Sequence, residues 1–183
     1  MGNELLAQYC SPVLANIKPS NLFSISNTLY NVDNLIEAWN KDFNKYDIYF
    51  KVLVKRKNTS SVICFKKDLL TDCINTNNNN CFLESCGYNT DNADTCINCL
   101  MKRILKNEFP HEIGVILGYP YEDVIGFIEN KGQNYLYKGY WKVYENIEER
   151  CKLFNLYNEN RRIYALAKDN ESEFIKLVEH SLS

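Results

Sequence analysis

The sequence predicts an α+β fold, in which one domain packs several helices on a small, mostly antiparallel sheet. Apolar residues recur at helical spacing in most segments, whereas only a few short segments alternate as strands do. The one clear pair of adjacent strands, 48–54 and 61–65, is joined by a short polar link and predicts a β-hairpin. This pattern favours α+β over a parallel sheet. A chain of 183 residues is expected to form a single domain, 1–183, and its 45% hydrophobic residues suffice for a core.

The first half of the chain is expected to mix helices and strands. A short helix is predicted at 4–9, and another begins at Ser11-Pro12, because serine caps helices and proline suits the first turn. Residues 21–26 alternate as a strand, and 31–43 carry apolar residues at helical spacing. In the first hairpin strand, the side chains expected on one face are Ile48, Phe50, Val52 and Val54.

The second half is expected to be mostly helical after an irregular, Cys- and Asn-rich insert at about 74–92. The run from Thr76 to Asn80 is low-complexity polar sequence and predicts a loop. The elements expected after the insert are helices at 94–106, 110–117 and 120–130, a strand at 140–144, a long helix capped by Asn146, and a final helix after Asp169-Asn170.

Charge and hydropathy argue against several classes of protein. The chain has 21 Lys+Arg and 23 Asp+Glu, a net charge of −2, whereas a general nucleic-acid binder has a basic excess, so we expect no DNA partner. No apolar stretch approaches the roughly 18 residues of a membrane span, so we expect no membrane association. The start of the chain has an acid where a signal peptide has a basic region. We therefore expect a cytoplasmic protein whose eight cysteines are thiols or metal ligands.

Two local features have the appearance of nucleic-acid sites, and a simpler interpretation is favoured for both. Residues 48–67 carry six basic residues, interleaved aromatics and no acid, but lysines also protect sheet edges from aggregation. The helices at 110–117 and 120–130 could form a helix-turn-helix, but Glu122 and Asp123 would be repelled by phosphates.

Three stretches of the sequence resemble one family. They are Cys10-Ser-Pro-Val-Leu-Ala-Asn-Ile-Lys-Pro-Ser-Asn-Leu-Phe23, Phe109-Pro-His-Glu-Ile-Gly-Val-Ile-Leu-Gly-Tyr-Pro-Tyr-Glu-Asp-Val-Ile-Gly-Phe127 and Gly139-Tyr-Trp-Lys-Val-Tyr144. Over about residues 5–168, the chain resembles domain-of-unknown-function family 3793, small uncharacterised proteins of anaerobic Gram-positive bacteria. The resemblance implies glycine at the position of Asn16 and no Cys-rich insert, so any role of the insert is particular to this chain. The resemblance implies no activity.

A Cys–His pair is the first candidate for chemistry. Cys10 directly precedes a predicted helix start, where the helix dipole favours a thiolate. His111 could act as its base, and Asp123 could orient His111 if the two short helices fold back on each other. This set predicts a Cys-dependent hydrolase or transferase. The alternative is that Cys10 is an inert buried thiol and that His111 caps its helix or bonds a carbonyl.

A metal site is the second candidate. The four thiols that could ligate one ion are Cys81, Cys86, Cys96 and Cys99. The two-residue gap between the last two lets both sulfurs face one ion, and four thiolates suit zinc or an iron–sulfur cluster. The alternatives are incidental thiols in a loose loop, or disulfides formed after purification. Zinc is the cofactor that this pattern suggests.

A non-catalytic binding or regulatory domain is the function that we favour, because no catalytic set is complete in the sequence. Its partner is expected to be an unknown small molecule or protein. The hypotheses differ in geometry: the enzyme needs the Cys10 sulfur within about 4 Å of a His111 ring nitrogen, and the binding domain needs a concave pocket. The expected binding residues are His111, Glu112, Tyr119, Trp141 and Lys142.

Overall fold

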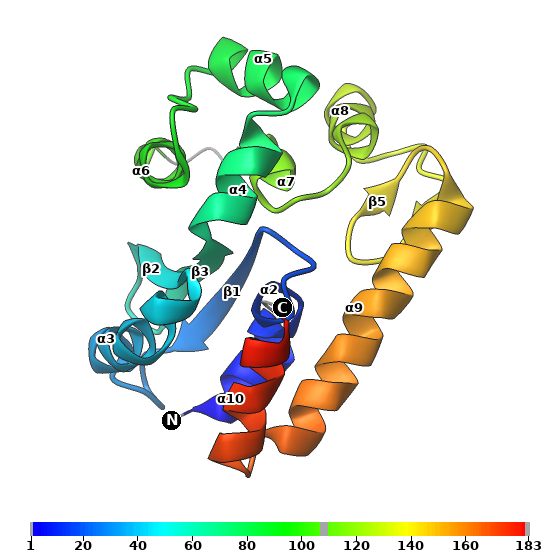
Figure 1. Ribbon diagram of the computed structural model, residues 1–183. Coiled ribbons are helices and arrows are strands. Elements are labelled where there is room, and N and C mark those ends of the chain that lie inside the picture. The colour runs from blue at the N-terminus through cyan, green and yellow to red at the C-terminus, as the bar shows by residue number, and fades with distance from the viewer. Residues whose placement is uncertain (1, 107–109, 182–183) are drawn as a thin grey trace.

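A three-stranded antiparallel sheet lies at the centre of the computed structural model, which describes residues 2–106 and 110–181 (Figure 1). Its middle strand is β3 (Thr59–Lys66), with β1 (Ser20–Ser26) on one side and β2 (Ile48–Lys55) on the other. Both pairings with β3 are antiparallel. The predicted α+β class and the predicted hairpin are therefore confirmed.

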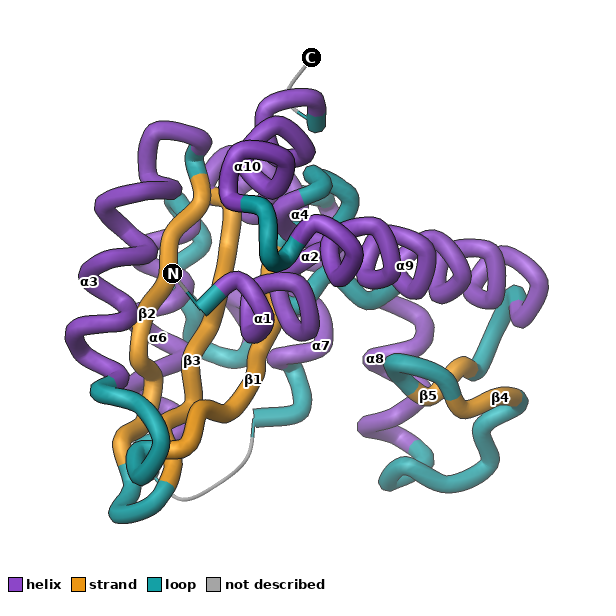
Figure 2. The backbone as a smooth tube through the Cα atoms, turned by 90° about the horizontal axis from the view of Figure 1, so that it is seen from below, coloured by secondary structure: helices purple, strands orange, loops and turns teal. Residues whose placement is uncertain are grey.

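Helices cover both faces of this sheet, so alternate strand residues enter two hydrophobic clusters (Figures 1 and 2). The helices that build the first cluster from the N-terminal half are α1 (Asn3–Leu5), the π-helix η1 (Leu6–Cys10), α2 (Ser11–Leu14) and α3 (Val32–Phe43), which a 3-10 turn (Asn44–Tyr46) follows. The helices that cover the other face are α4 (Lys67–Ile74) and α6 (Ala93–Ile104).

The strand β2 carries a bulge that changes the face of its last residues. Its pairing with β3 shifts between Val52 and Val54. Phe50 is buried in the first cluster and Val52 packs against it, whereas Val54 packs against the second cluster. The expectation that these residues share one face is therefore wrong at Val54, because a bulge interrupts the alternation of side chains.

The outer edge of β2 is closed by a side chain of α3. The Asn40 amide nitrogen donates to the Phe50 carbonyl at 2.9 Å, and the Phe50 N–H donates to the Asn40 carbonyl oxygen at 2.8 Å. This pair of bonds replaces those of a neighbouring strand, so it protects the edge against pairing with another chain.

The Cys- and Asn-rich insert is more ordered than its sequence suggests. Residues expected to be irregular form α5 (Asn77–Ser85), so the prediction of a loop from Thr76 to Asn80 is wrong. Asn79 donates to the Cys73 carbonyl at 2.8 Å, and Asn80 donates to the Thr90 hydroxyl at 2.8 Å. Leu83 is fully buried. These two hydrogen bonds to residues outside the helix, together with the burial of Leu83, stabilise a helix that the weak helix propensity of asparagine does not favour.

The remaining elements include a small hairpin, formed by two short strands, that lies apart from the central sheet (Figures 1 and 2). They are α7 (Ile113–Ile116), α8 (Tyr121–Glu129), β4 (Tyr137–Lys138), β5 (Lys142–Val143), α9 (Ile147–Ala167) and α10 (Glu171–His180). The long helix α9 joins the two clusters: Phe154 and Tyr157 enter the second, and Tyr164 and Ala167 enter the first. Of these elements, only β4 has no counterpart in the sequence prediction.

Two backbone positions in the resembling stretches take the left-handed conformation that suits glycine. Gly118 has a φ of +76°, and a Cβ there would lie 2.4 Å from Pro19. Asn16 has a φ of +58°. Asparagine tolerates this region better than most residues, which agrees with the glycine that the resemblance implies at that position.

Candidate functional site

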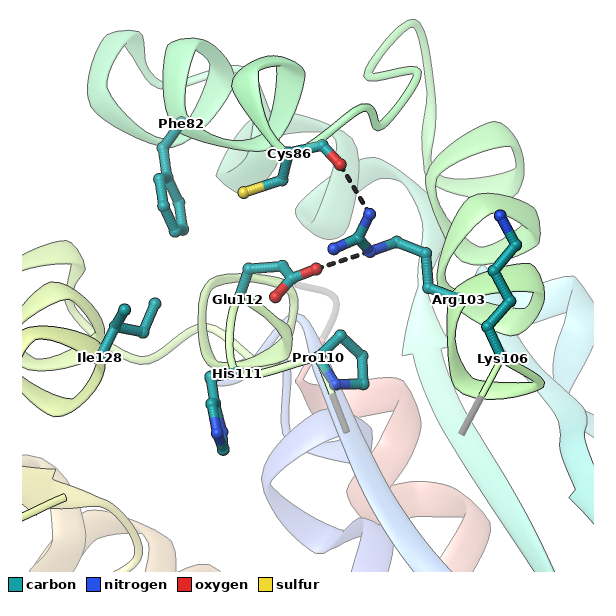
Figure 3. A pocket seen from close by; sticks show the side chains of 8 residues that line it. All are labelled: Phe82, Cys86, Arg103, Lys106, Pro110, His111, Glu112 and Ile128. Atoms are coloured by element: carbon teal, nitrogen blue, oxygen red, sulfur yellow. Dashed lines mark hydrogen bonds and ion pairs between the residues drawn. The ribbon is translucent and has the colours of Figure 1, made fainter. Parts of the chain in front are cut away.

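A cavity of about 380 Å³ opens among α5, α6, α7 and α8 (Figure 3). Two of the predicted binding residues, His111 and Glu112, line it. The other lining residues are Phe82, Cys86, Arg103, Lys106, Pro110 and Ile128. The cavity therefore combines a carboxylate, two cations, a thiol and apolar walls, which is the composition of many small-molecule sites.

The helix α6 positions Arg103 at the cavity. A capping box fixes its start, since the Asn92 side chain accepts from Thr95 N–H and the Thr95 hydroxyl is bonded to the Asn92 backbone. Cys96 and Leu100 are fully buried on one face of the helix. Arg103 follows them by seven and three residues, so it lies over the same face at the C-terminal end, where the helix dipole favours a cation.

An ion pair between Arg103 and Glu112 forms the polar centre of the cavity. Arg103 Nε lies 2.7 Å from Glu112 Oε1, and Arg103 Nη1 donates to the Cys86 carbonyl at 2.8 Å. The Tyr88 hydroxyl donates to Glu112 Oε1 at 3.3 Å. Burial, with a smaller contribution from the Glu112 charge, raises the pKa of Tyr88, so this phenol stays a donor at neutral pH.

Two polar atoms of this ion pair are left for a ligand. Among residues 2–106 and 110–181, Glu112 Oε2 and Arg103 Nη2 have no hydrogen-bond partner. Figure 3 shows the outer guanidinium nitrogen of Arg103 pointing into the space between Cys86 and Glu112. Burial, followed by the Glu112 charge, raises the pKa of Cys86, so it is a neutral thiol in this space.

The other predicted binding residues lie beside the cavity in a row of aromatic contacts. The His111 ring lies 5.1 Å from the Phe127 ring and points away from Glu112 (Figure 3). Phe127 contacts Trp141 at 5.3 Å, and Trp141 stacks on Tyr119 at 4.9 Å. Lys142 Nζ lies 5.5 Å from the centre of the Phe127 ring. Phe127 thus contacts His111, Trp141 and Lys142, and Tyr119 joins this group through Trp141. Of the predicted binding residues, His111 and Glu112 line the cavity.

Gly114 allows this row to approach α7. A Cβ at this position would lie 2.7 Å from a Val124 methyl carbon and 2.9 Å from the Trp141 ring. Distances under 3.0 Å are essentially never seen for real Cβ atoms, so any side chain here would displace α8 or the indole. This close approach explains the glycine in the His-Glu-Ile-Gly run.

Cys10 and His111 lie in different parts of the molecule. Cys10 is fully buried in the first cluster, on the side of the sheet opposite to α6 and α7. Its neighbour Cys64 is also fully buried, and burial together with the adjacent Cys10 thiol raises the pKa of Cys64. His111 lines the cavity among the helices of the second cluster. The geometry therefore offers no support for the hydrolase hypothesis, which stays a prediction.

Asp123, the predicted orienting residue, is an anchor between elements. It is buried, and its Oδ1 accepts from the Tyr144 N–H at 2.7 Å and the Glu145 N–H at 3.3 Å. Its Oδ2 accepts from Arg150 Nε at 2.9 Å. Both oxygens are thus engaged in holding the end of β5 and the start of α9 against α8.

The structure does not gather the four cysteines predicted to bind zinc. Cys81 is exposed, Cys96 is buried, and Cys86 lines the cavity with Arg103. Cys99 is half-buried on α6, and all eight cysteines are free. Within the described ranges, no group of three or more His, Cys, Asp or Glu side chains is placed to hold a metal ion. Burial raises the pKa of Cys96 to about 12, so this thiol stays protonated.

Lys18 is a buried charged group that sequence reasoning missed. It is 1% exposed, and its Nζ donates to Asn21 Oδ1 at 2.6 Å and to the Tyr119 hydroxyl at 3.3 Å. The same nitrogen lies 4.5 Å from the centre of the Tyr119 ring. Burial lowers the pKa of Lys18 to about 7. The only signal in the sequence was its place in the first resembling stretch.

Comparison with known proteins identifies a family without an assigned activity. No curated protein matches the chain, and no solved structure matches it. No helix of the described residues has the length and apolar character needed to span a bilayer. Residues 6–178 match the family described as protein of unknown function (DUF3793), which covers most of the chain. The chain therefore belongs to the DUF3793 family.

Proposed function

We propose that this protein is a non-catalytic domain that binds a small organic anion in the cavity among α5, α6, α7 and α8. The observation that carries the proposal is the Arg103 guanidinium, which Glu112 and the Cys86 carbonyl hold with Nη2 directed into the cavity (Figure 3). A guanidinium held in this way is already oriented for a carboxylate or phosphate, so little side-chain entropy is lost on binding.

The walls of the cavity favour a ligand that also has a flat apolar part. Phe82, Pro110 and Ile128 line the cavity with carbon surface, and Lys106 adds a second cation at its rim. Phe82 is held edge-on by Tyr121, with ring centres 5.9 Å apart. The volume of about 380 Å³ lies at the small end of the range for ligand sites.

The non-catalytic part of the proposal rests on the state of the nucleophiles. Cys10 is fully buried, and the raised pKa of Cys86 keeps the one thiol that lines the cavity protonated. Asp123 is engaged through both oxygens. We place the protein in the cytoplasm, because eight free cysteines suit a reducing compartment.

The experiment that tests the proposal is chemical-shift mapping with 3-phenylpropionate, which carries a carboxylate and a phenyl ring. We expect binding with a dissociation constant on the order of 1 mM, as suits a ligand of this size. The shifted amides should belong to the end of α5, the last turn of α6 and the start of α7. Shifts centred on another surface, or no shifts at 10 mM, would contradict the proposed site.

A further inference from the structure

We infer that the ligand is an α-amino acid with an apolar side chain; this inference rests on the proposed function and names the ligand class of the same cavity. The first observation is the state of Glu112. Glu112 is 7% exposed, and its Oε1 contacts Arg103 and accepts from the Tyr88 hydroxyl. Its Oε2 has no hydrogen-bond partner within the described part of the chain. A carboxylate oxygen that has no donor within the protein can accept a hydrogen bond from a ligand that brings one.

The second observation is that an unpaired donor, Arg103 Nη2, lies on the side chain that contacts Glu112. Arg103 Nη2 belongs to the guanidinium whose Nε contacts Glu112 at 2.7 Å, so a cationic donor and an anionic acceptor face the same cavity. An α-amino acid carries an ammonium and a carboxylate on one carbon. The ammonium can donate to Glu112 Oε2 while the carboxylate accepts from Arg103 Nη2.

Ligands with only one of the two groups fit the cavity less well. A simple carboxylic acid leaves Glu112 Oε2 without a donor and places a second negative charge beside it. A simple amine leaves Arg103 Nη2 unpaired. Phe82, Pro110 and Ile128 then favour an apolar side chain on the amino acid, because they offer carbon surface to the remaining space.

The experiment is isothermal titration of the purified protein with four related compounds: L-phenylalanine, 3-phenylpropionate, phenethylamine and N-acetyl-L-phenylalanine. We expect L-phenylalanine to bind at least about tenfold more tightly than each of the others, since each of them lacks one charged group. The comparison needs no variant, so it is independent of whether a substitution disturbs the fold.

Glu112→Gln tests the assigned contact directly. The amide keeps an oxygen for Arg103 and removes the charge that attracts the ammonium, so the preference for L-phenylalanine over 3-phenylpropionate should fall to about threefold or less. Glu129→Gln, an exposed acid next to Ile128 on α8, is the matched control and should retain the full preference.

The outcomes separate the two proposals. If 3-phenylpropionate binds as tightly as L-phenylalanine, and Arg103→Met weakens both, the proposed function stands and the amino-acid inference is wrong. If Glu112→Gln keeps the preference for L-phenylalanine, the inference is also wrong. If none of the four compounds binds at 10 mM, both the proposed function and the inference are overturned.

Discussion

At the scale of single residues, Lys18 and Glu112 are both buried, but only Glu112 has an opposite charge beside it. The Arg103 guanidinium lies 2.7 Å from Glu112, whereas the hydrogen bonds of Lys18 are to the neutral side chains of Asn21 and Tyr119. Such a desolvated amine destabilises the folded state when it is protonated. Lys18 should therefore link stability to pH.

Lys18→Met should remove this link. Because the pKa of Lys18 is about 7 in the fold and 10.5 in the unfolded chain, the unfolded state binds more protons between these values. Stability then rises with pH above 7, and the contribution of Lys18 changes by about 1–2 kcal/mol between pH 7 and 8.5. Urea unfolding should show that the free-energy advantage of Lys18→Met over the wild-type protein shrinks by that amount as the pH rises from about 7 to 8.5. The exposed Lys102 supplies the control, because the stability difference between Lys102→Met and the wild-type protein should stay constant over this pH range. A constant difference for Lys18→Met as well would contradict the lowered pKa of Lys18.

A local sequence signal pointed to two residues that share one cavity, and their role in binding stays a prediction. His111 and Glu112 were predicted from the run that contains them, and both line the cavity. Arg103 was missed because its role depends on α5, which the Asn-rich sequence did not reveal. The burial of Lys18 depends on Tyr119 and Tyr157, more than 100 residues away, so no nearby pattern predicts it.

At the scale of elements, the sequence predicted most helices and strands because their patterns are strong. The amphipathic helix α3 and the hairpin of β2 and β3 appear within a few residues of the expected bounds. The failures at α5 and at Val54 have a common cause, which is contact with residues outside the segment itself. Hydrogen bonds to Cys73 and Thr90 stabilise α5, and the bulge in β2 redirects Val54. Neither effect leaves a periodic signal in the sequence.

Gly114→Ala should separate elements that now touch. The added methyl would lie 2.7 Å from Val124 and 2.9 Å from Trp141, so α8 or the indole must move. We expect a loss of about 1–3 kcal/mol in the free energy of unfolding and a changed tryptophan fluorescence spectrum. Urea unfolding and emission spectra measure these effects.

Trp141→Leu in the Gly114→Ala background supplies the control. The smaller side chain leaves room for the methyl, so the two substitutions together should destabilise the protein less than the sum of their separate effects. Strict additivity would show that the methyl does not meet the indole.

At the scale of the whole molecule, α9 joins the two hydrophobic clusters on either side of the sheet (Figure 1). Its Phe154 and Tyr157 pack in one cluster, and its Tyr164 and Ala167 pack in the other. Since the same fold buries some cysteines and exposes others, the reactivity of the eight thiols reports on the entire structure.

Labelling with iodoacetamide should follow burial. Cys81 is exposed and should react first, whereas Cys10, Cys64 and Cys96 are buried and should react at least about 100-fold more slowly in the native protein. Peptide mass spectrometry after timed labelling measures each site. A Cys81 that stays protected until a chelator is added would instead indicate the zinc site that the cysteine spacing suggested.

Arg103 is the residue on which the proposed binding site most directly depends, and Lys102 is an exposed cation next to it on α6. The decisive measurement is the dissociation constant of 3-phenylpropionate for Arg103→Met and Lys102→Met, each checked for folding by circular dichroism. We expect at least about tenfold weaker binding for Arg103→Met, which loses the guanidinium, and unchanged binding for Lys102→Met. Equal affinities for the two variants would contradict the assignment of this cavity as the binding site.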